Sequence, residues 1–133
     1  KMKEKYNTLL NLEAQKIPLN NPDELLLQDC ISYIKSNISE PELSVEEIAK
    51  YLHISRTNLH RKIKMMTGHS PIELIKIIKM KQAAYLLEES KLTISEISYQ
   101  VGYNSLSYFS SSFNSYWGVP PTVYLKNKEN KSK

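Results

Sequence analysis

The sequence is poor in cysteine, glycine and long hydrophobic runs, and each shortage excludes a class of protein. One cysteine, Cys30, cannot form an internal disulfide framework or a zinc site of several cysteines. Three glycines in 133 residues argue against glycine-rich phosphate loops and nucleophile elbows, and favour a mostly helical chain. No run approaches the roughly 18 apolar residues that cross a bilayer, and the N-terminus lacks the apolar core of a signal peptide. We therefore predict a soluble, cytoplasmic domain with a reduced thiol.

The charge of the chain is unevenly distributed. The formal net charge is only +4, from 18 lysines and arginines and 14 acidic residues. Residues 22–43 carry −4, whereas residues 44–92 carry +4 and residues 93–125 carry −1. Between Arg56 and Lys81 there are seven basic residues and a single acidic one. Such a cluster is typical of proteins whose affinity for DNA comes from the release of counterions.

Capping residues and apolar periodicity divide the chain into helices. With 41% hydrophobic residues, the chain can bury one core of ordinary size. Residues 1–21 are interpreted as a linker or the remnant of an upstream element, residues 22–126 as the domain, and residues 127–133 as a basic tail. Helices are predicted from Pro22, over residues 44–51, 56–66 and 71–90, from Thr93, and over residues 105–116 and 121–126. The predicted fold class is all-α, with about seven helices.

The second half of the domain repeats the pattern of the first. Residues 44–68 and 93–118 are each predicted to form a helix-turn-helix, joined by a long linker helix over residues 71–90. Matched residues of the two halves are 49 positions apart before the turn and 50 positions apart after it, because the second turn has one extra residue. The matched pairs are Val45 and Ile94, Glu47 and Glu96, Ile48 and Ile97, Leu52 and Val101, Ile54 and Tyr103, Leu59 and Phe109, Ile63 and Phe113, Gly68 and Gly118, Pro71 and Pro121, and Leu74 and Tyr124. Two units do not make a solenoid, so a duplicated helix-turn-helix is predicted.

The helix over residues 56–66 has the properties of a DNA-recognition helix. In a helix-turn-helix, the second helix buries one face and lies in the major groove with the other. At about 100° per residue, Leu59 and Ile63 share the buried face, and Arg61 and Lys64 point away from it. Arginine binds a guanine edge and lysine binds phosphate. We therefore predict double-stranded DNA as the partner, bound here by Arg56, Thr57, Asn58, His60, Arg61 and Lys64.

The helix over residues 105–116 has a polar face without charge. Residues 92–125 contain no lysine or arginine, so this helix releases no counterions and the first unit is predicted to be the principal anchor. At about 1.5 Å per residue the linker helix is about 30 Å long, close to the spacing of about 34 Å between successive major grooves. The two recognition helices are therefore predicted to enter successive grooves. The candidate contacts of the second helix are Ser105, Ser107, Ser110, Ser111 and Asn114.

Two motifs in the chain resemble the DNA-binding domain of the AraC/XylS family. They are SVEEIAKYLHISRTNLHRKIKMMTGHSP and TISEISYQVGYNSLSYFSSSFNSYWGVPP, separated by a linker helix that contains KMKQAAYLL. The resemblance covers about residues 22–126. The NPDELLLQDC and SRTNLHRKIKMMTG segments are most similar to the C-terminal output module of hybrid two-component regulators. In those proteins one chain joins a periplasmic sensor, a histidine kinase and a receiver to this domain.

The resemblance implies a transcription regulator, usually an activator, whose upstream part senses a signal. It implies RNA polymerase as a further partner, and homodimerisation through domains outside this sequence. It also implies a full-length protein anchored in the inner membrane, with this domain in the cytoplasm. No cofactor, metal or small-molecule ligand is expected in this domain.

The sequence departs from the family pattern at three positions. Family members commonly have a basic residue where Ser111 and Asn114 stand. The first turn has His53 where glycine is frequent, and the second turn has Gly102. A positive φ at that position would place modest strain on the histidine.

Parts of the sequence are also compatible with functions other than DNA binding. DNA repair alkyltransferases also carry such a unit, which would make Cys30 an acceptor, but its place in an apolar stripe predicts burial. His53, His60 and His69 lack the spacing and companion carboxylates of a metal site, so no catalytic residue is predicted. The uncharged second helix leaves open a protein-interaction module with weakened DNA binding. A stand-alone, effector-binding regulator is the alternative to a two-component origin.

Overall fold

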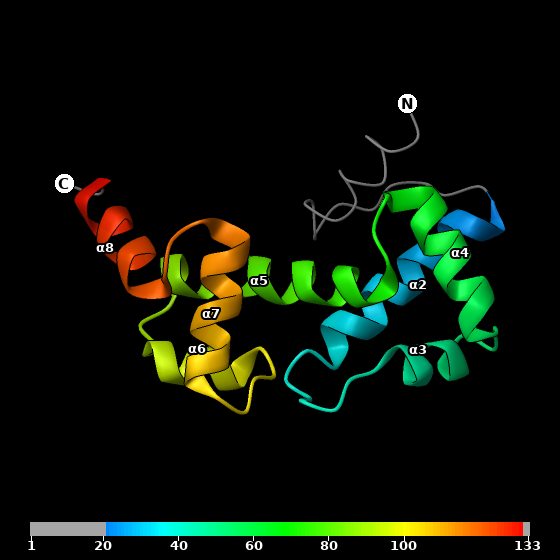
Figure 1. The fold of residues 1–133 in the computed structure, drawn as a ribbon, viewed down its shortest axis with the longest axis horizontal. Helices are drawn as coiled ribbons and strands as arrows, with labels where there is room; N and C mark the ends of the chain where they lie inside the picture. The colour runs from blue at the N-terminus through cyan, green and yellow to red at the C-terminus, as the bar shows by residue number, and fades with distance from the viewer. Residues whose placement is uncertain (1–20, 132–133) are drawn as a thin grey trace. The chain divides into compact units, whose positions relative to one another are not determined.

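Figure 1 shows the computed structural model of the chain, which describes residues 21–131 and the side chains of residues 21–129. Every regular element in that part of the chain is an α-helix, so the predicted all-α class is confirmed. The predicted leading linker, apart from its last residue, lies outside the described residues. The helices are α2 (Pro22–Ser36), α3 (Val45–Tyr51), α4 (Arg56–Thr67), α5 (Pro71–Glu89), α6 (Ile94–Gln100), α7 (Leu106–Trp117) and α8 (Pro121–Lys131). None of the described helices is both long enough and apolar enough to cross a membrane.

The described residues form two compact units, each with one helix-turn-helix. Unit 1 contains residues 21–37 and 43–76, and unit 2 contains residues 38–42 and those from Ile77 onward. The connection between α2 and α3 therefore belongs to unit 2, although both helices belong to unit 1. The 19 residues of α5 form one helix that contributes to both units.

Unit 1 is built around an aliphatic core. Asn21 begins α2 by accepting the Glu24 N–H at 2.9 Å, and Ser44 begins α3 by accepting the Glu47 N–H at 3.1 Å. Tyr33 joins the two helices, because its hydroxyl donates to the Glu47 carboxylate at 2.5 Å. The fully buried residues of this core are Leu27, Cys30, Ile34, Ile48, Leu59, Ile63, Met66 and Leu74.

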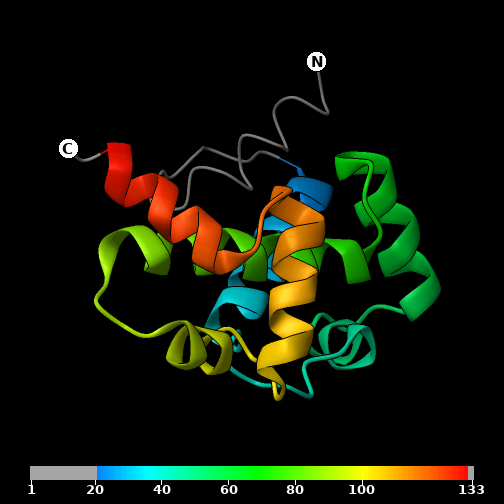
Figure 2. The same ribbon diagram turned by 60° about the vertical axis from the view of Figure 1, so that its left-hand side comes forward.

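Unit 2 has a core rich in aromatic rings. Phe109 and Phe113 of α7 are fully buried, with ring centroids 5.9 Å apart. Tyr124 of α8 packs edge-on against Phe113, with the two centroids separated by 5.4 Å. In both views α7 lies across α5, and the Trp117 indole donates to the Met80 carbonyl at 3.0 Å (Figure 1 and Figure 2). These aromatic side chains therefore pack α7 against its neighbours in unit 2.

The two duplicated turns have the same backbone hydrogen bonds. In the first turn the His53 N–H donates to the Lys50 carbonyl at 3.2 Å, and in the second the Gly102 N–H donates to the Tyr99 carbonyl at 3.0 Å. Both residues have positive φ, 55° for His53 and 81° for Gly102. The second turn has one additional residue, Asn104, before the next helix, which accounts for the change of offset. The strain predicted for the histidine is therefore present.

We expect His53→Gly to raise the free energy of unfolding by about 0.5–1 kcal/mol. The left-handed conformation costs other residues about 1–2 kcal/mol, and the greater freedom of glycine in the unfolded chain offsets part of the gain. His53 is exposed, so little packing is lost. Urea unfolding measures the change. His53→Ala keeps the unfavourable φ and is the control, so equal stabilisation by both substitutions would contradict the explanation.

The last helix is longer than predicted. α8 continues to Lys131, whereas the sequence predicted an end near residue 126 and a basic tail beyond it. The additional residues include no proline or glycine, and lysine and glutamate favour helix. The hydroxyl of Tyr124 also donates to the Glu88 carboxylate, which fastens α8 to α5. Most of the predicted tail is therefore helical.

Candidate nucleic-acid interface

Capping and burial together fix the orientation of α4. The helix begins where the Ser55 hydroxyl oxygen accepts the Asn58 N–H at 3.1 Å, and it ends at Gly68, whose φ is 81°. Leu59 and Ile63 are fully buried on its inner face, as the apolar spacing predicted. Side chains on the opposite face are consequently held toward solvent.

The solvent face of α4 carries the candidate contact residues together. Thr57, His60, Arg61 and Lys64 are all exposed. Asn58 is exposed as well, and its side-chain oxygen accepts a hydrogen bond from the Arg61 guanidinium at 3.0 Å. This bond uses one of the five guanidinium donors. Within the described part of the chain, neither Arg61 nor Lys64 forms an ion pair.

The basic cluster contains fewer available cations than its sequence indicates. Arg56 forms an ion pair with the Glu46 carboxylate, and the Lys62 ammonium lies 2.6 Å from a carboxylate oxygen of Asp23. Lys79 is only 8% exposed, its ammonium lies over a tyrosine ring, and burial lowers its pKa. Ion pairing and burial thus engage three of the seven cations within the protein, which leaves Arg61 and Lys64 as the available charges on α4.

The solvent face of α7 is polar and uncharged. Ser107, Ser111 and Asn114 are exposed, and Ser110 is half-buried beside them. Ser105 caps the helix, where its hydroxyl oxygen accepts a backbone N–H at 3.1 Å and its proton remains available as a donor. The five candidate residues therefore lie on one helix and its cap, but none brings a positive charge.

Two apolar side chains beside this face were not predicted as candidates. Leu106 is 43% exposed and Tyr108 is 66% exposed, at the start of α7. They occupy the positions that correspond to Arg56 and Asn58 in α4 at the offset of 50. The helical periodicity of the sequence places them at the two edges of the buried face of α7, and this position could have identified them. The first turn of a recognition helix contacts base edges, so both lie where α7 would meet DNA.

Cys30 is buried in unit 1. Its side chain has no exposed surface, and burial raises the pKa of the thiol to about 12. The thiol is therefore protonated at neutral pH and does not have the thiolate character of an acceptor cysteine. Among residues 21–129, no three or more His, Cys, Asp or Glu side chains are grouped as metal ligands.

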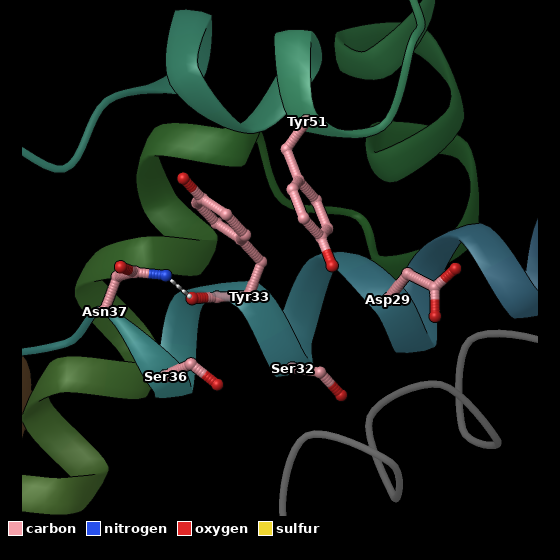
Figure 3. Close-up of a pocket in the computed structure, with 6 residues that line it drawn as sticks. All are labelled: Asp29, Ser32, Tyr33, Ser36, Asn37 and Tyr51. Carbon is pink, nitrogen blue, oxygen red and sulfur yellow. Dashed lines mark hydrogen bonds between the residues drawn. The ribbon is translucent and has the colours of Figure 1, made fainter.

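A cavity of about 270 Å³ opens on unit 1 between α2 and α3 (Figure 3). Tyr33 of α2 and Tyr51 of α3 form its aromatic wall, with ring centroids 4.4 Å apart. The hydrogen bond to the Glu47 carboxylate raises the pKa of Tyr33 above its ordinary value. The other lining residues are Asp29, Ser32, Ser36 and Asn37. Since no candidate DNA contact lines it, the cavity is separate from the interface on α4.

The arrangement of helices and the pattern of the sequence define the class of protein. A family model described as a helix-turn-helix domain matches residues 24–127, which include both helix-turn-helix units and α5. The chain belongs to this family, and the resemblance to the AraC-type DNA-binding domain is confirmed.

Its relatives include regulators and a signalling protein. The chain is 36% identical over 124 residues to Histidine kinase P4 of Formosa agariphila. These residues cover 93% of this chain and 9% of that protein. It is 40% identical over 88 residues to the Msm operon regulatory protein of Streptococcus mutans. These residues cover 66% of this chain and 32% of that protein. The chain therefore spans less than half the length of either relative.

A solved structure has the same fold. The C-terminal domain of AraT, a response regulator from Geobacillus stearothermophilus, is similar with a TM-score of 0.74 and 36% identity. The similarity covers 80% of this chain and 86% of that domain. The chain thus has the family pattern and the fold of an AraC-type DNA-binding domain.

Proposed function

We propose that this domain binds DNA mainly through α4, with α7 making weaker contacts. The observation that supports this division is the charge of the two solvent faces. Arg61 and Lys64 are exposed on α4 without ion pairs in the described part of the chain, whereas residues 92–125 contain no basic residue. Cations that replace counterions on phosphates supply most of the affinity that is independent of sequence.

Each candidate residue has a role that follows from its chemistry. Arg61 is proposed to donate to a guanine edge, and Arg56 and Lys64 to bind phosphate. Thr57, Asn58 and His60 add further hydrogen-bond donors and acceptors on the same face. The proposed contacts of α7 are Ser105, Ser107, Ser110, Ser111 and Asn114. That the two helices enter successive major grooves stays a prediction.

The salt dependence of duplex binding tests the proposed function. The slope of log K against log salt concentration is expected to be about −0.9 for each phosphate neutralised. Lys64→Ala is expected to make the slope shallower by about one unit while weakening all duplexes alike. Fluorescence anisotropy with a labelled duplex measures both effects.

Lys91→Ala makes the same change of charge at an exposed position outside α4 and is the matched control. An equal change of slope for the two variants would contradict the assignment of α4. If the wild-type domain bound no duplex at low salt, the proposed function itself would be wrong.

We further propose that this domain is the output part of a longer signal-responsive regulator. The supporting observations are the similarity to a histidine kinase that is far longer than this chain and to the C-terminal domain of a response regulator. In this proposal a phosphorelay acts on the preceding domains, which dimerise, and the domain described here contacts DNA and RNA polymerase in the cytoplasm. The full-length protein would be anchored in the membrane through its sensor.

One observation favours a second function, the binding of another protein. The exposed Tyr108 and Leu106 border an uncharged face, and interfaces between proteins are rich in tyrosine and poor in charge at their centres. Loss of all duplex binding in the salt experiment would favour this alternative.

A further inference from the structure

We propose that Glu46 of α3 competes with DNA phosphates for Arg56 and so restrains binding that is independent of sequence. The inference rests on the proposed function of α4, because it concerns a residue at the start of that helix. Glu46 is not among the candidate DNA contacts, and its carboxylate forms an ion pair with the Arg56 guanidinium. While this pair is formed, the positive charge of Arg56 is not available to a DNA phosphate.

The surroundings of the pair allow it to open. The Arg56 side chain is 57% exposed and the Glu46 side chain is 61% exposed. No other hydrogen bond or ion pair holds either group in the described part of the chain. An exposed ion pair of this kind contributes little to the free energy of unfolding, so the domain stays folded when the pair opens.

A phosphate can replace the carboxylate as the partner of Arg56. Both anions accept two parallel N–H bonds from a guanidinium, and arginine is well suited to such contacts. While the pair is closed, the charge of Arg56 is already compensated within the protein, and no counterion is released on its account. When it opens, the Glu46 carboxylate remains near the DNA and repels it. Both effects lower affinity.

The second unit provides an internal comparison. At the offsets of 49 and 50, the positions of Glu46 and Arg56 correspond to Ser95 and Leu106. The acid is thus present in the unit that carries the cation and absent from the unit that lacks it. This pattern fits a carboxylate whose role is to balance Arg56.

The competition affects phosphate binding and leaves base recognition unchanged. Contacts to phosphate carry no direct information about sequence, whereas the contact proposed for Arg61 is to a base. By restraining a phosphate contact, Glu46 lowers affinity for all DNA while the energy of the base contacts is retained. We therefore assign Glu46 a role in limiting non-specific binding.

A double-mutant cycle on a mixed-sequence duplex tests the proposal. Glu46→Gln is expected to raise affinity about three- to tenfold at low salt and to steepen the salt slope by up to about one unit. In the Arg56→Gln background, the same substitution is expected to have less than half of that effect on log K. Circular dichroism would verify that all variants are folded.

The comparison of backgrounds separates the proposal from simpler explanations. An equal gain with and without Arg56 would mean that Glu46 only repels DNA, and a loss of affinity in Glu46→Gln would mean that Glu46 positions Arg56 for DNA. Either result overturns the proposal. Glu42→Gln removes the same charge from an exposed residue outside α3 and α4 and is expected to change affinity less. Absence of binding by the wild-type domain would instead overturn the proposed function, so the two failures are distinguishable.

Discussion

Replacing Gly102 by alanine is expected to lower the free energy of unfolding by about 3 kcal/mol. The residue has a φ of 81°, where any side chain costs about 1–2 kcal/mol. It is also buried, and an added Cβ would lie 2.5 Å from the Ile38 carbonyl oxygen and 2.7 Å from the Lys79 ammonium nitrogen. The lysine end can move, but the carbonyl belongs to the backbone of the α2–α3 connection. The substitution therefore combines a conformational penalty with a displacement of the main chain.

Gly118→Ala separates these two contributions. Its φ is 85°, almost the same as that of Gly102, but an added Cβ would meet no atom of the described residues within 4 Å. We expect a loss of only about 1–2 kcal/mol there, from conformation alone. Urea or thermal unfolding of both variants measures the difference. Equal losses would show that the crowding around Gly102 relaxes without cost.

Replacing Arg61 by alanine is expected to weaken binding to a preferred duplex by about 1–3 kcal/mol, or roughly five- to 150-fold. Arg61 is exposed on α4, and its fixed fork of donors suits the two acceptors of a guanine edge. Loss of a base contact also relaxes the preference at one position of the site, unlike the loss of a phosphate contact. A duplex selected from a random pool by the wild-type domain, and its single-base variants, provide the measurement.

Ser111 occupies the corresponding position of α7 and is the matched control. Ser111→Ala is expected to cost less affinity than Arg61→Ala, because a neutral hydroxyl contributes less than a guanidinium. Ser111→Arg is expected to strengthen binding to most duplexes with little change in preference. Equal losses from the two alanine substitutions would mean that α4 is not the principal anchor.

Much of the fold follows from local features of the sequence. Ser55 stands directly before a predicted helix and Thr93 at the predicted start of another, and both cap their helices in the structure. Leu59 and Phe109, one from each half, are buried because apolar residues recur at the period of a helix. A positive φ could be expected for His53 because its position matches that of Gly102 in the duplicated turn. These features depend on a few neighbouring residues, so a single sequence is sufficient to predict them.

The availability of charges could not be predicted in this way. Seven basic residues between Arg56 and Lys81 contribute equally to the charge of the sequence, yet Lys79 is buried and Lys62 is paired with Asp23. The extension of α8 to Lys131 was also missed, because the basic residues after Lys126 were interpreted as a tail.

The sequence by itself determined the helices, the duplication and the uncharged face of α7, because periodicity, capping and residue type are local properties. Only the tertiary structure decided which of the basic side chains are paired or buried within the protein and which remain available to DNA. The pairs of Arg56 with Glu46 and of Lys62 with Asp23 join residues 10 and 39 positions apart. Partners at such separations are set by the packing of one helix on another, which no local pattern encodes.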